Sequence, residues 1–381
     1  MTRAAKVVFW VAGGALVYAQ AGYPVLLAAL ARVRGAREDG APPTPAASEP
    51  RVSLIVAAHR EADVIAAKVR NALALDWPRE RLEVIVACDG SPDDTPACAR
   101  EAGADIVLKL PWGGKVRAQD AAVERARGEL LAFSDANARW EPGALRALAA
   151  RFADPAVGYA CGQVRFVSEG GTNQEGLYWR YEMAIRALES RLCSVTAGNG
   201  AIYAVRREAY VRVDPLMGHD LSLPFTLVKR GWRAVYEPQA RATEKMVPSI
   251  EGEFARKRRM MSHAWPIVLR GGLLSPRGYP PLYALMVASH RLLRYATPLL
   301  HVLLAVASTA LAVRPGERVA RAALAAQAAL VAAAAAGASL RARPLLVARY
   351  YVLTTASIAA GLWDHLRHGT PAGWAPPEGT R

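Results

Sequence analysis

The segment GELLAFSDAN, residues 128–137, decides the fold of this chain. Its apolar stretch, Leu130 to Phe133, is short and unbroken, as in a strand that is buried on both faces. Asp135 and Asn137 follow at once and offer two oxygen donors that suit a divalent cation bridging a pyrophosphate. A capped helix start or an Asx turn is the alternative interpretation of these two residues.

Three further apolar runs precede this segment: VSLIVAA at 52–58, LEVIVAC at 82–88 and ADIVLKL at 104–110. They alternate with helix-patterned segments, an arrangement that is typical of a mostly parallel sheet covered by helices. The sequence therefore predicts an α/β domain over residues 51–270, with a doubly wound first half. Sheets of this kind bind ligands beyond the carboxyl ends of their strands.

The loops after these three runs carry candidate binding residues. The turn at Ala57 and the carboxylate of Glu61 could meet a base or a ribose, although an acid also suits the first turn of a helix. Asp89 ends the second run, where turn chemistry alone does not require a carboxylate. Gly113-Gly114-Lys115 opens a helix whose free N–H groups and lysine can offset phosphate charge. It is not a Walker loop, because Val116 stands where that motif has Ser or Thr.

Long apolar runs flank the predicted domain, at 7–31, 295–313, 322–340 and 344–363. Only the last contains a charge, Arg349, and each can cross a hydrocarbon core of about 30 Å as a helix. We therefore expect one span before the domain and about three after it. A cleaved signal peptide is the alternative for the first run, and a soluble helical bundle for the alanine-rich third run.

The excess positive charge is concentrated in the two segments that contain these apolar runs. The formal charge is +15, of which residues 1–40 and 271–381 hold +11, so residues 41–270 hold only +4. Such a distribution favours contact with a lipid bilayer and argues against nucleic-acid binding. Arg32, Arg34 and Arg37 favour a cytoplasmic domain at the inner (plasma) membrane with both termini outside, whereas the arginines of loop 314–321 argue mildly against that orientation.

The predicted organisation has six parts. They are an N-terminal transmembrane anchor (1–38), a Pro/Ala-rich linker (39–50), the α/β domain (51–270), an interfacial helix region (271–294), the C-terminal transmembrane helices (295–365) and a tail (366–381). An extension of the first C-terminal span is the alternative for the interfacial helix. The four cysteines show neither zinc spacing nor a disulfide pattern, so we expect them reduced.

Four motifs, in this order, resemble the family 2 glycosyltransferases of the GT-A fold: VSLIVAAHRE, ACDGSPDD, GGKVRAQDAAVERARGELLAFSDANA and GNGAIYAVRR. The resemblance covers roughly residues 51–270 and suggests a membrane-bound, polysaccharide synthase-like subgroup. It implies a nucleotide site and a site for Mg²⁺ or Mn²⁺. The implied nucleotide-binding residues are Ala57, Glu61, Asp89, Lys115, Ser134 and Asp135, and the implied metal ligands are Asp135 and Asn137.

The resemblance also implies a catalytic base, and the matching residue here is Asp220. His219 stands where the family often has Glu, and Asn137 where it usually has a second Asp. The cations near residues 256–259 replace the Gln-x-x-Arg-Trp motif of processive synthases, which favours single addition. The implied acceptor or diphosphate contacts are Asn199, Gly200, His219, Arg256 and Arg259.

These features together predict an inverting enzyme. It would move a sugar from a nucleotide-sugar, with a UDP-sugar the family-level guess, to an acceptor hydroxyl in cell-envelope or exopolysaccharide synthesis. The acceptor would be a carbohydrate or a lipid-linked molecule. Two alternatives stay open: transfer to a polyprenyl phosphate, and a catalytically inactive membrane scaffold.

Overall fold

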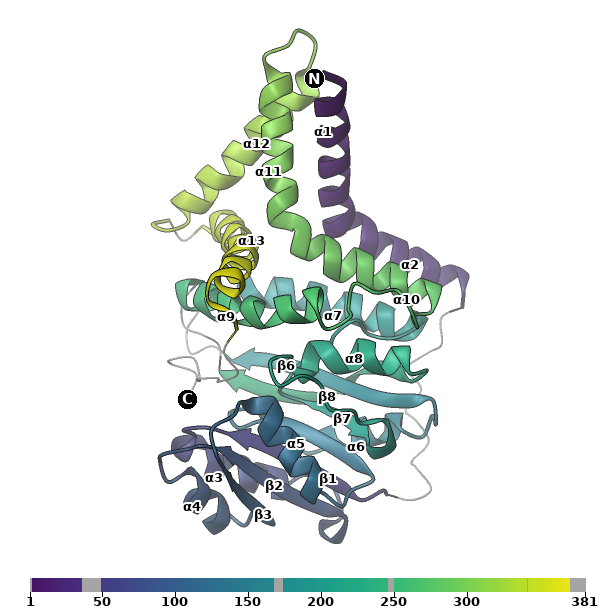
Figure 1. The fold of residues 1–381 in the computed structure, drawn as a ribbon, viewed down its shortest axis with the longest axis vertical. Helices are drawn as coiled ribbons and strands as arrows, with labels where there is room; N and C mark the ends of the chain where they lie inside the picture. Colours follow the sequence, from purple (N-terminus) through teal and green to yellow (C-terminus); the bar gives the residue numbers. More distant parts are fainter. Residues whose placement is uncertain (1, 36–48, 168–173, 246–249, 341, 371–381) are drawn as a thin grey trace.

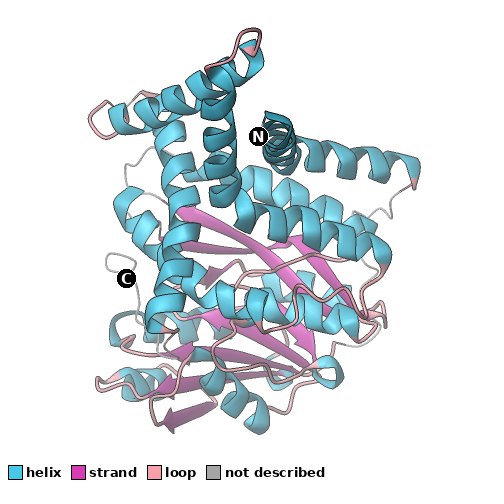
Figure 2. Cartoon of the chain, turned by 45° about the horizontal axis from the view of Figure 1, so that its top comes forward, coloured by secondary structure: helices cyan, strands magenta, loops and turns pink. Residues whose placement is uncertain are grey.

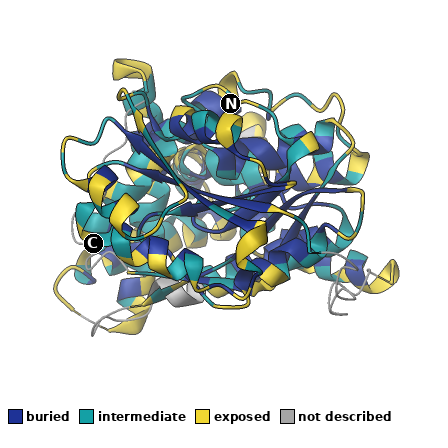
Figure 3. Cartoon of the chain, turned by 90° about the horizontal axis from the view of Figure 1, so that it is seen from below, coloured by how far each residue is buried: buried dark blue, intermediate teal, exposed yellow. Residues whose placement is uncertain are grey.

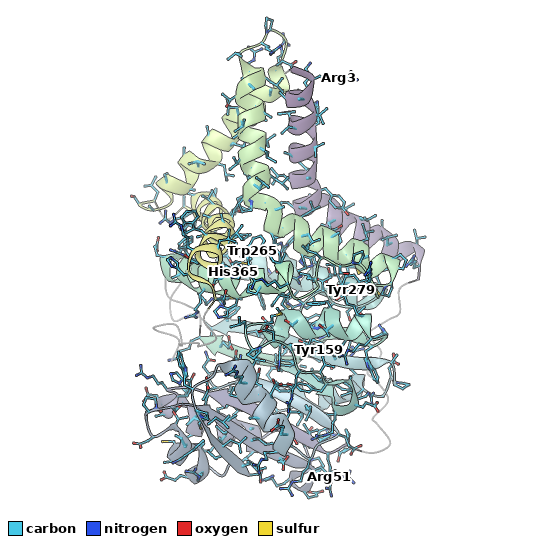
Figure 4. The ribbon with its side chains drawn as sticks, in the orientation of Figure 1. Arg3, Arg51, Tyr159, Trp265, Tyr279 and His365 are labelled. Atoms are coloured by element: carbon cyan, nitrogen blue, oxygen red, sulfur yellow. The ribbon has the colours of Figure 1, made fainter. Side chains whose placement is uncertain are left out.

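The computed structural model describes residues 2–35, 49–167, 174–245, 250–340 and 342–370. Figure 1 shows a sheet-containing domain at one end of the long axis and a group of helices at the other. Arg3 lies at the helical tip and Arg51 at the opposite end (Figure 4). Most of the predicted linker, residues 39–48, falls outside the described residues.

The domain is built on one eight-stranded mixed sheet with the order β3-β2-β1-β4-β7-β6-β8-β5. Strands β1 to β4 pair in parallel, so the predicted parallel half is confirmed. The second half is mixed, because β7 runs antiparallel to β4 and to β6. The strands are β1 (Val52–Ala58), β2 (Leu82–Asp89), β3 (Ile106–Leu110), β4 (Leu130–Asp135), β5 (Arg139–Trp140), β6 (Val157–Val167), β7 (Tyr203–Arg206) and β8 (Arg233–Lys245).

Helices cover both faces of the sheet, which is why its strands are dark with burial in Figure 3. Side chains alternate along each strand, so Ile55 and Phe133 pack towards one layer and Leu54 and Ala132 towards the other. The first layer contains α5 (Lys115–Arg125), α7 (Gln174–Leu192) and α8 (His219–Lys229). The second contains α3 (Ala62–Leu73), α4 (Thr95–Glu101) and α6 (Ala144–Arg151).

Four helical stretches are long and apolar enough to cross a membrane: Arg3–Val33, Pro281–Ala312, Arg318–Ala336 and Arg343–His368. The first joins α1 (Thr2–Val17), η1 (Tyr18–Gly22) and α2 (Tyr23–Val33). The second joins α10 (Pro281–Met286), η4 (Val287–Leu292) and α11 (Leu293–Ala312), and the last two are α12 (Arg318–Ala336) and α13 (Arg343–His368). Figures 1 and 2 show α1 beside α11, with α2 and α10 bending over the domain.

A buried polar cluster fastens these bent segments to the domain. Glu189 of α7 accepts hydrogen bonds from the hydroxyl of Tyr23 at 2.6 Å and from Nδ1 of His290 at 2.7 Å. Arg294 pairs with Glu182, and Arg291 donates to Thr196 at 2.9 Å. The basic residues of the predicted interfacial helix therefore face acids of the domain, and the helix continues without a break into α11.

Helix α13 lies across the other apolar helices and against α9 (Ile250–Leu269), as Figure 1 shows by viewing it nearly end-on. Arg349, near its start, pairs with Glu251, and Asp364, near its end, pairs with Arg258 at 2.6 Å. Just beyond it, the hydroxyl of Thr370 donates to the carbonyl of Ser262 at 2.8 Å. The predicted orientation, with both termini outside, stays a prediction, and residues 371–381 of the predicted tail lie outside the described residues.

Candidate functional site

The carboxyl end of β4 and the start of α5 bring Asp135 and Lys115 together as an ion pair. Burial opposes the charge of Lys115, but the neighbouring carboxylates of Asp135 and Asp220 outweigh it and raise the pKa of Lys115. Gly200 adjoins this pair, because a Cβ added there would lie 3.3 Å from Nζ of Lys115 and 3.6 Å from Oδ2 of Asp135. The structure thus gathers three of the predicted residues at one place.

Asp89 organises the loop that presents Lys115. Its carboxylate accepts hydrogen bonds from the backbone N–H groups of Gly113 at 2.7 Å and of Gly114 at 2.9 Å. Gly114 has φ 99°, a left-handed value that favours glycine. Because Asp89 is only 1% exposed, its observed role is to hold this turn, and the nucleoside contact stays a prediction.

The loop after β1 is tied to the loop after β2. The N–H of Glu61 donates to the hydroxyl of Thr95 at 2.9 Å, and a ring nitrogen of His59 lies 2.6 Å from the carbonyl oxygen of Asp89. Glu61 is buried at the start of α3, and Ala57 is buried within β1. Their predicted contacts with a nucleotide stay predictions.

Asp220 lies in the first turn of α8 and is partly exposed. Within the described residues, no hydrogen bond reaches its carboxylate, and it is near enough to Lys115 for their charges to interact. Its backbone carbonyl accepts the N–H of Gly198 at 2.7 Å, which joins α8 to the loop that contains Gly200. The predicted base is therefore beside the Lys115–Asp135 pair, with its carboxylate available to accept a proton.

Three predicted residues are packed into the domain and do not line an open surface. His219 is 3% exposed, with ring nitrogens 2.9 Å from the hydroxyl of Tyr203 and 3.5 Å from that of Tyr210. Asn199 bonds the carbonyl of Gly162 and the N–H of Ile202. Ser134 is fully buried and donates to the carbonyl of Ala201 at 3.1 Å. These positions give the three residues supporting roles, and their direct ligand contacts stay predictions.

His219 should make stability depend on pH. Burial, reinforced by the charge of Lys115, lowers its pKa from 6.5 to about 3. Between pH 6.5 and pH 3 the His219 imidazole is protonated in the unfolded chain but neutral in the folded chain. The folded state therefore loses stability as pH falls from 6.5 towards 3. The loss is at most about 1.4 kcal/mol per pH unit. Melting temperatures of His219→Gln should show a shallower decline over this window than wild type, whereas those of the exposed His368→Gln should follow wild type.

Two charged residues near Asp135, the buried Lys68 and the partly buried Glu244, were not predicted from the sequence. Burial, together with the charge of Asp135, raises the pKa of Glu244 to about 7. Burial also lowers the pKa of Lys68 to about 7, against the opposing influence of Asp135 and Glu244. Nζ of Lys68 donates to the carbonyl of Ala138 at 2.8 Å. No motif marks either residue, because their proximity depends on how α3 and β8 are placed in the fold.

Among the cationic residues of α9, Arg256 interacts electrostatically with the region around Asp135. Arg256 forms a two-pronged ion pair with Glu253, with both contacts at 2.7 Å, and also acts electrostatically on Glu244. Lys257 pairs with Glu253 at 3.1 Å. Arg259 is partly buried on the same helix. Arg256 is therefore within range of the site, while the acceptor or diphosphate contacts of both arginines stay predictions.

The residues around Asp135 suit a divalent cation that also binds phosphate. Asp135 and Asn137 are both partly exposed and supply hard oxygen donors. Within the described residues, no three of His, Cys, Asp or Glu gather as a metal cage. This is compatible with Mg²⁺-type sites, in which one or two carboxylates bind the ion and substrate phosphates complete its shell.

Comparison with known proteins finds a family match within the domain. Residues 53–213 match the glycosyl transferase family 2 profile. A mannosyltransferase from Pyrobaculum calidifontis, solved in complex with GDP-Man and Mn²⁺, has a TM-score of 0.69 and 25% identity, covering 96% of this chain and 99% of that chain.

Two curated relatives are more limited matches. The β-monoglucosyldiacylglycerol synthase of Synechocystis sp. is 31% identical over 59% of this chain and 50% of that protein. An N-acetylglucosaminyltransferase of Rhizobium sp. is 27% identical over 55% of this chain and 51% of that protein. The chain thus spans about half the length of these relatives. The matched segment, the sheet and the shared architecture show that the chain has the GT-A fold and that residues 53–213 are similar to glycosyl transferase family 2.

Proposed function

We propose that this protein transfers a sugar, with inversion, from a nucleotide-sugar to the hydroxyl of an acceptor held at a membrane surface. The observation that carries the proposal is the position of Asp220. Its available carboxylate interacts electrostatically both with Lys115 at the strand ends and with Tyr295 of α11. The candidate base therefore lies between the donor side of the site and the apolar helices.

Asp220 would accept the acceptor proton as the acceptor oxygen attacks the anomeric carbon. The bond from that carbon to the nucleoside diphosphate breaks, and the configuration inverts because the attack is a direct displacement. Lys115 would stabilise negative charge on the departing diphosphate. A divalent cation at Asp135 and Asn137 would neutralise the same leaving group when bound. The Mn²⁺ in the structure of the Pyrobaculum mannosyltransferase supports a divalent cofactor.

The surroundings of Asp220 favour an amphiphilic acceptor. The rings of Tyr295 and Trp265 are 5.9 Å apart, and Nε1 of Trp265 donates to the carbonyl of Ile358 in α13 at 3.1 Å. In Figure 4, Trp265 lies where the domain meets the apolar helices. An acceptor whose hydroxyl reaches Asp220 can thus leave its apolar part among these helices. The name of the Synechocystis relative, a β-monoglucosyldiacylglycerol synthase, agrees with a lipid acceptor.

The donor and the acceptor can be tested together. Detergent-purified protein would be incubated with UDP-, GDP- and dTDP-sugars, Mg²⁺ or Mn²⁺, and one of three acceptors: a diacylglycerol-type lipid, a polyprenyl phosphate or a soluble sugar. We expect nucleotide release with one class of donor and only when the hydroxyl-bearing lipid is present. Mass spectrometry of the product and proton NMR of its anomeric centre would establish the linkage and the inversion.

The other outcomes decide against parts of the proposal. A product formed only on polyprenyl phosphate would replace the hydroxyl acceptor by a phosphate. Efficient transfer to a soluble sugar would contradict an acceptor held at the membrane. A protein that binds no nucleoside diphosphate by calorimetry would instead be an inactive scaffold.

A further inference from the structure

The cation site suggested by the sequence is short of negative charge. Asp135 is its only carboxylate from the β4 loop, since Asn137 is neutral. The charge of Asp135 is also shared with Lys115. A divalent ion that binds a diphosphate is usually held by one or two carboxylates, so a second carboxylate near Asp135 would strengthen the site.

The pairing of β5 with β8 directs Glu244 to this loop. Arg139 is opposite Thr243, and Trp140 is opposite Ala242, in an antiparallel register. One further step along both strands places Glu244 opposite Ala138, the residue after Asn137. Side chains alternate along a strand, so Glu244 points to the same side of the sheet as Ala242, which is buried.

The carboxylate of Glu244 is positioned for a ligand that the protein does not supply. Its Oε1 is buried and has no hydrogen-bond partner among the described residues. Asp135, Arg256, Lys115 and Lys68 all lie within electrostatic range of it. A buried polar oxygen is unfavourable in a folded protein unless it has a hydrogen-bond partner or a ligand, so this position of Glu244 is typical of a binding residue.

Lys68 does not satisfy this oxygen. Its Nζ donates to the carbonyl of Ala138 and lies 5.2 Å from the centre of the Trp140 ring. Arg256 is likewise committed to Glu253 through two contacts. The neighbouring cations therefore offset the charge of Glu244 from a distance, and its Oε1 is left to accept a ligand.

We propose that Glu244 is the second carboxylate of the cation site and supplies the charge that Asn137 lacks. Asp135 and Glu244 together would balance a Mg²⁺ or Mn²⁺ ion, with Asn137 contributing a neutral oxygen. With Asp135 contributing to the cation site, the ammonium group of Lys115 would interact with the diphosphate. This inference rests on the proposed function, because it assigns a ligand to the same donor site.

The test is Mn²⁺ binding by the full-length protein in detergent, measured by calorimetry with saturating UDP or GDP. We expect Glu244→Gln to weaken Mn²⁺ binding roughly 10- to 100-fold, the range seen when support for a metal site is lost. Glu141→Gln is the matched control, because Glu141 follows β5 and its carboxylate forms surface ion pairs with Arg165 at 3.7 Å and Arg241 at 3.8 Å. This control should bind Mn²⁺ as wild type does.

A compensating variant separates a ligand from a structural residue. Asn137→Asp restores a carboxylate beside Asp135, so Asn137→Asp combined with Glu244→Gln should recover most of the lost Mn²⁺ affinity. Melting temperatures without metal should be no lower for Glu244→Gln than for wild type, because the substitution removes a buried charge. Recovery with an unchanged melting temperature would identify Glu244 as a ligand.

Two results would overturn the inference. Wild-type Mn²⁺ affinity in Glu244→Gln would show that Glu244 does not bind the ion. Weakened affinity that Asn137→Asp does not restore, in a variant with a lowered melting temperature, would assign Glu244 a structural role. If the wild-type protein bound neither UDP nor GDP in the presence of Mn²⁺, the proposed function itself would be refuted. The same titration therefore distinguishes failure of this inference from failure of the proposed function.

Discussion

Asp220→Asn should abolish most sugar transfer while leaving the donor site intact. The amide keeps the size of the side chain but cannot take up the proton of the acceptor, and general-base catalysis contributes about 10²–10⁴-fold to rate. We expect kcat to fall by roughly that factor, because no other described carboxylate is unengaged at this position. The measurement is kcat for transfer beside the Kd for nucleoside diphosphate, with Kd expected to be unchanged.

Asp214→Asn provides the control for this substitution. Asp214 is exposed in the loop before α8, and its side chain accepts the N–H of Leu216 at 2.9 Å, a bond that Asn can also accept. Its activity should equal that of wild type. Full transfer activity in Asp220→Asn would remove Asp220 from the reaction and leave the catalytic base unassigned.

Asp135→Asn should impair both the binding of the donor and the chemical step. The substitution removes the anionic partner of Lys115 and the principal charge expected to hold a cation. Loss of one group that stabilises a developing charge costs about 10²–10³-fold in kcat. We also expect Mn²⁺-dependent nucleotide binding to weaken by at least about tenfold, measured by calorimetry with and without metal.

The contrast between the two variants is diagnostic. Asp220→Asn should bind the donor and fail to transfer, whereas Asp135→Asn should fail at both. Asp76→Asn serves as a control for the second variant, because it removes a surface ion pair with Arg146, of a kind that contributes little. If Asp135→Asn kept its metal-dependent nucleotide affinity, the cation would have to bind elsewhere.

The parallel half of the sheet was predictable because its strands are buried on both faces. The run VSLIVAA coincides with β1, and the apolar stretch before Asp135 coincides with β4. Such strands must be apolar along their whole length, so their limits are visible in composition. The residues at their carboxyl ends could be assigned to one place by the topology alone.

The remaining parts of the site depend on contacts distant in sequence. Glu244 lies in RATEK, where its neighbours suggest an ordinary surface residue, and only the register of β8 with β5 brings it to Asp135. The burial of His219 depends on Tyr203 and Tyr210, which α8 packs against. Local pattern contains neither relationship, so the sequence could indicate His219 as an acceptor contact, which stays a prediction, but could not predict its burial.

The placement of α13 also bears on membrane topology. Because both ends of α13 are bonded to α9, we expect α13 to lie against the domain. Of the four candidate spans among the described residues, those that contain α1, α11 and α12 would then cross a bilayer, which is an odd number. The start of α1 and the end of α13 would then face different compartments. The connection between α11 and α12 would share the compartment of the start of α1, since Lys6 and Glu317 form an ion pair at 2.6 Å.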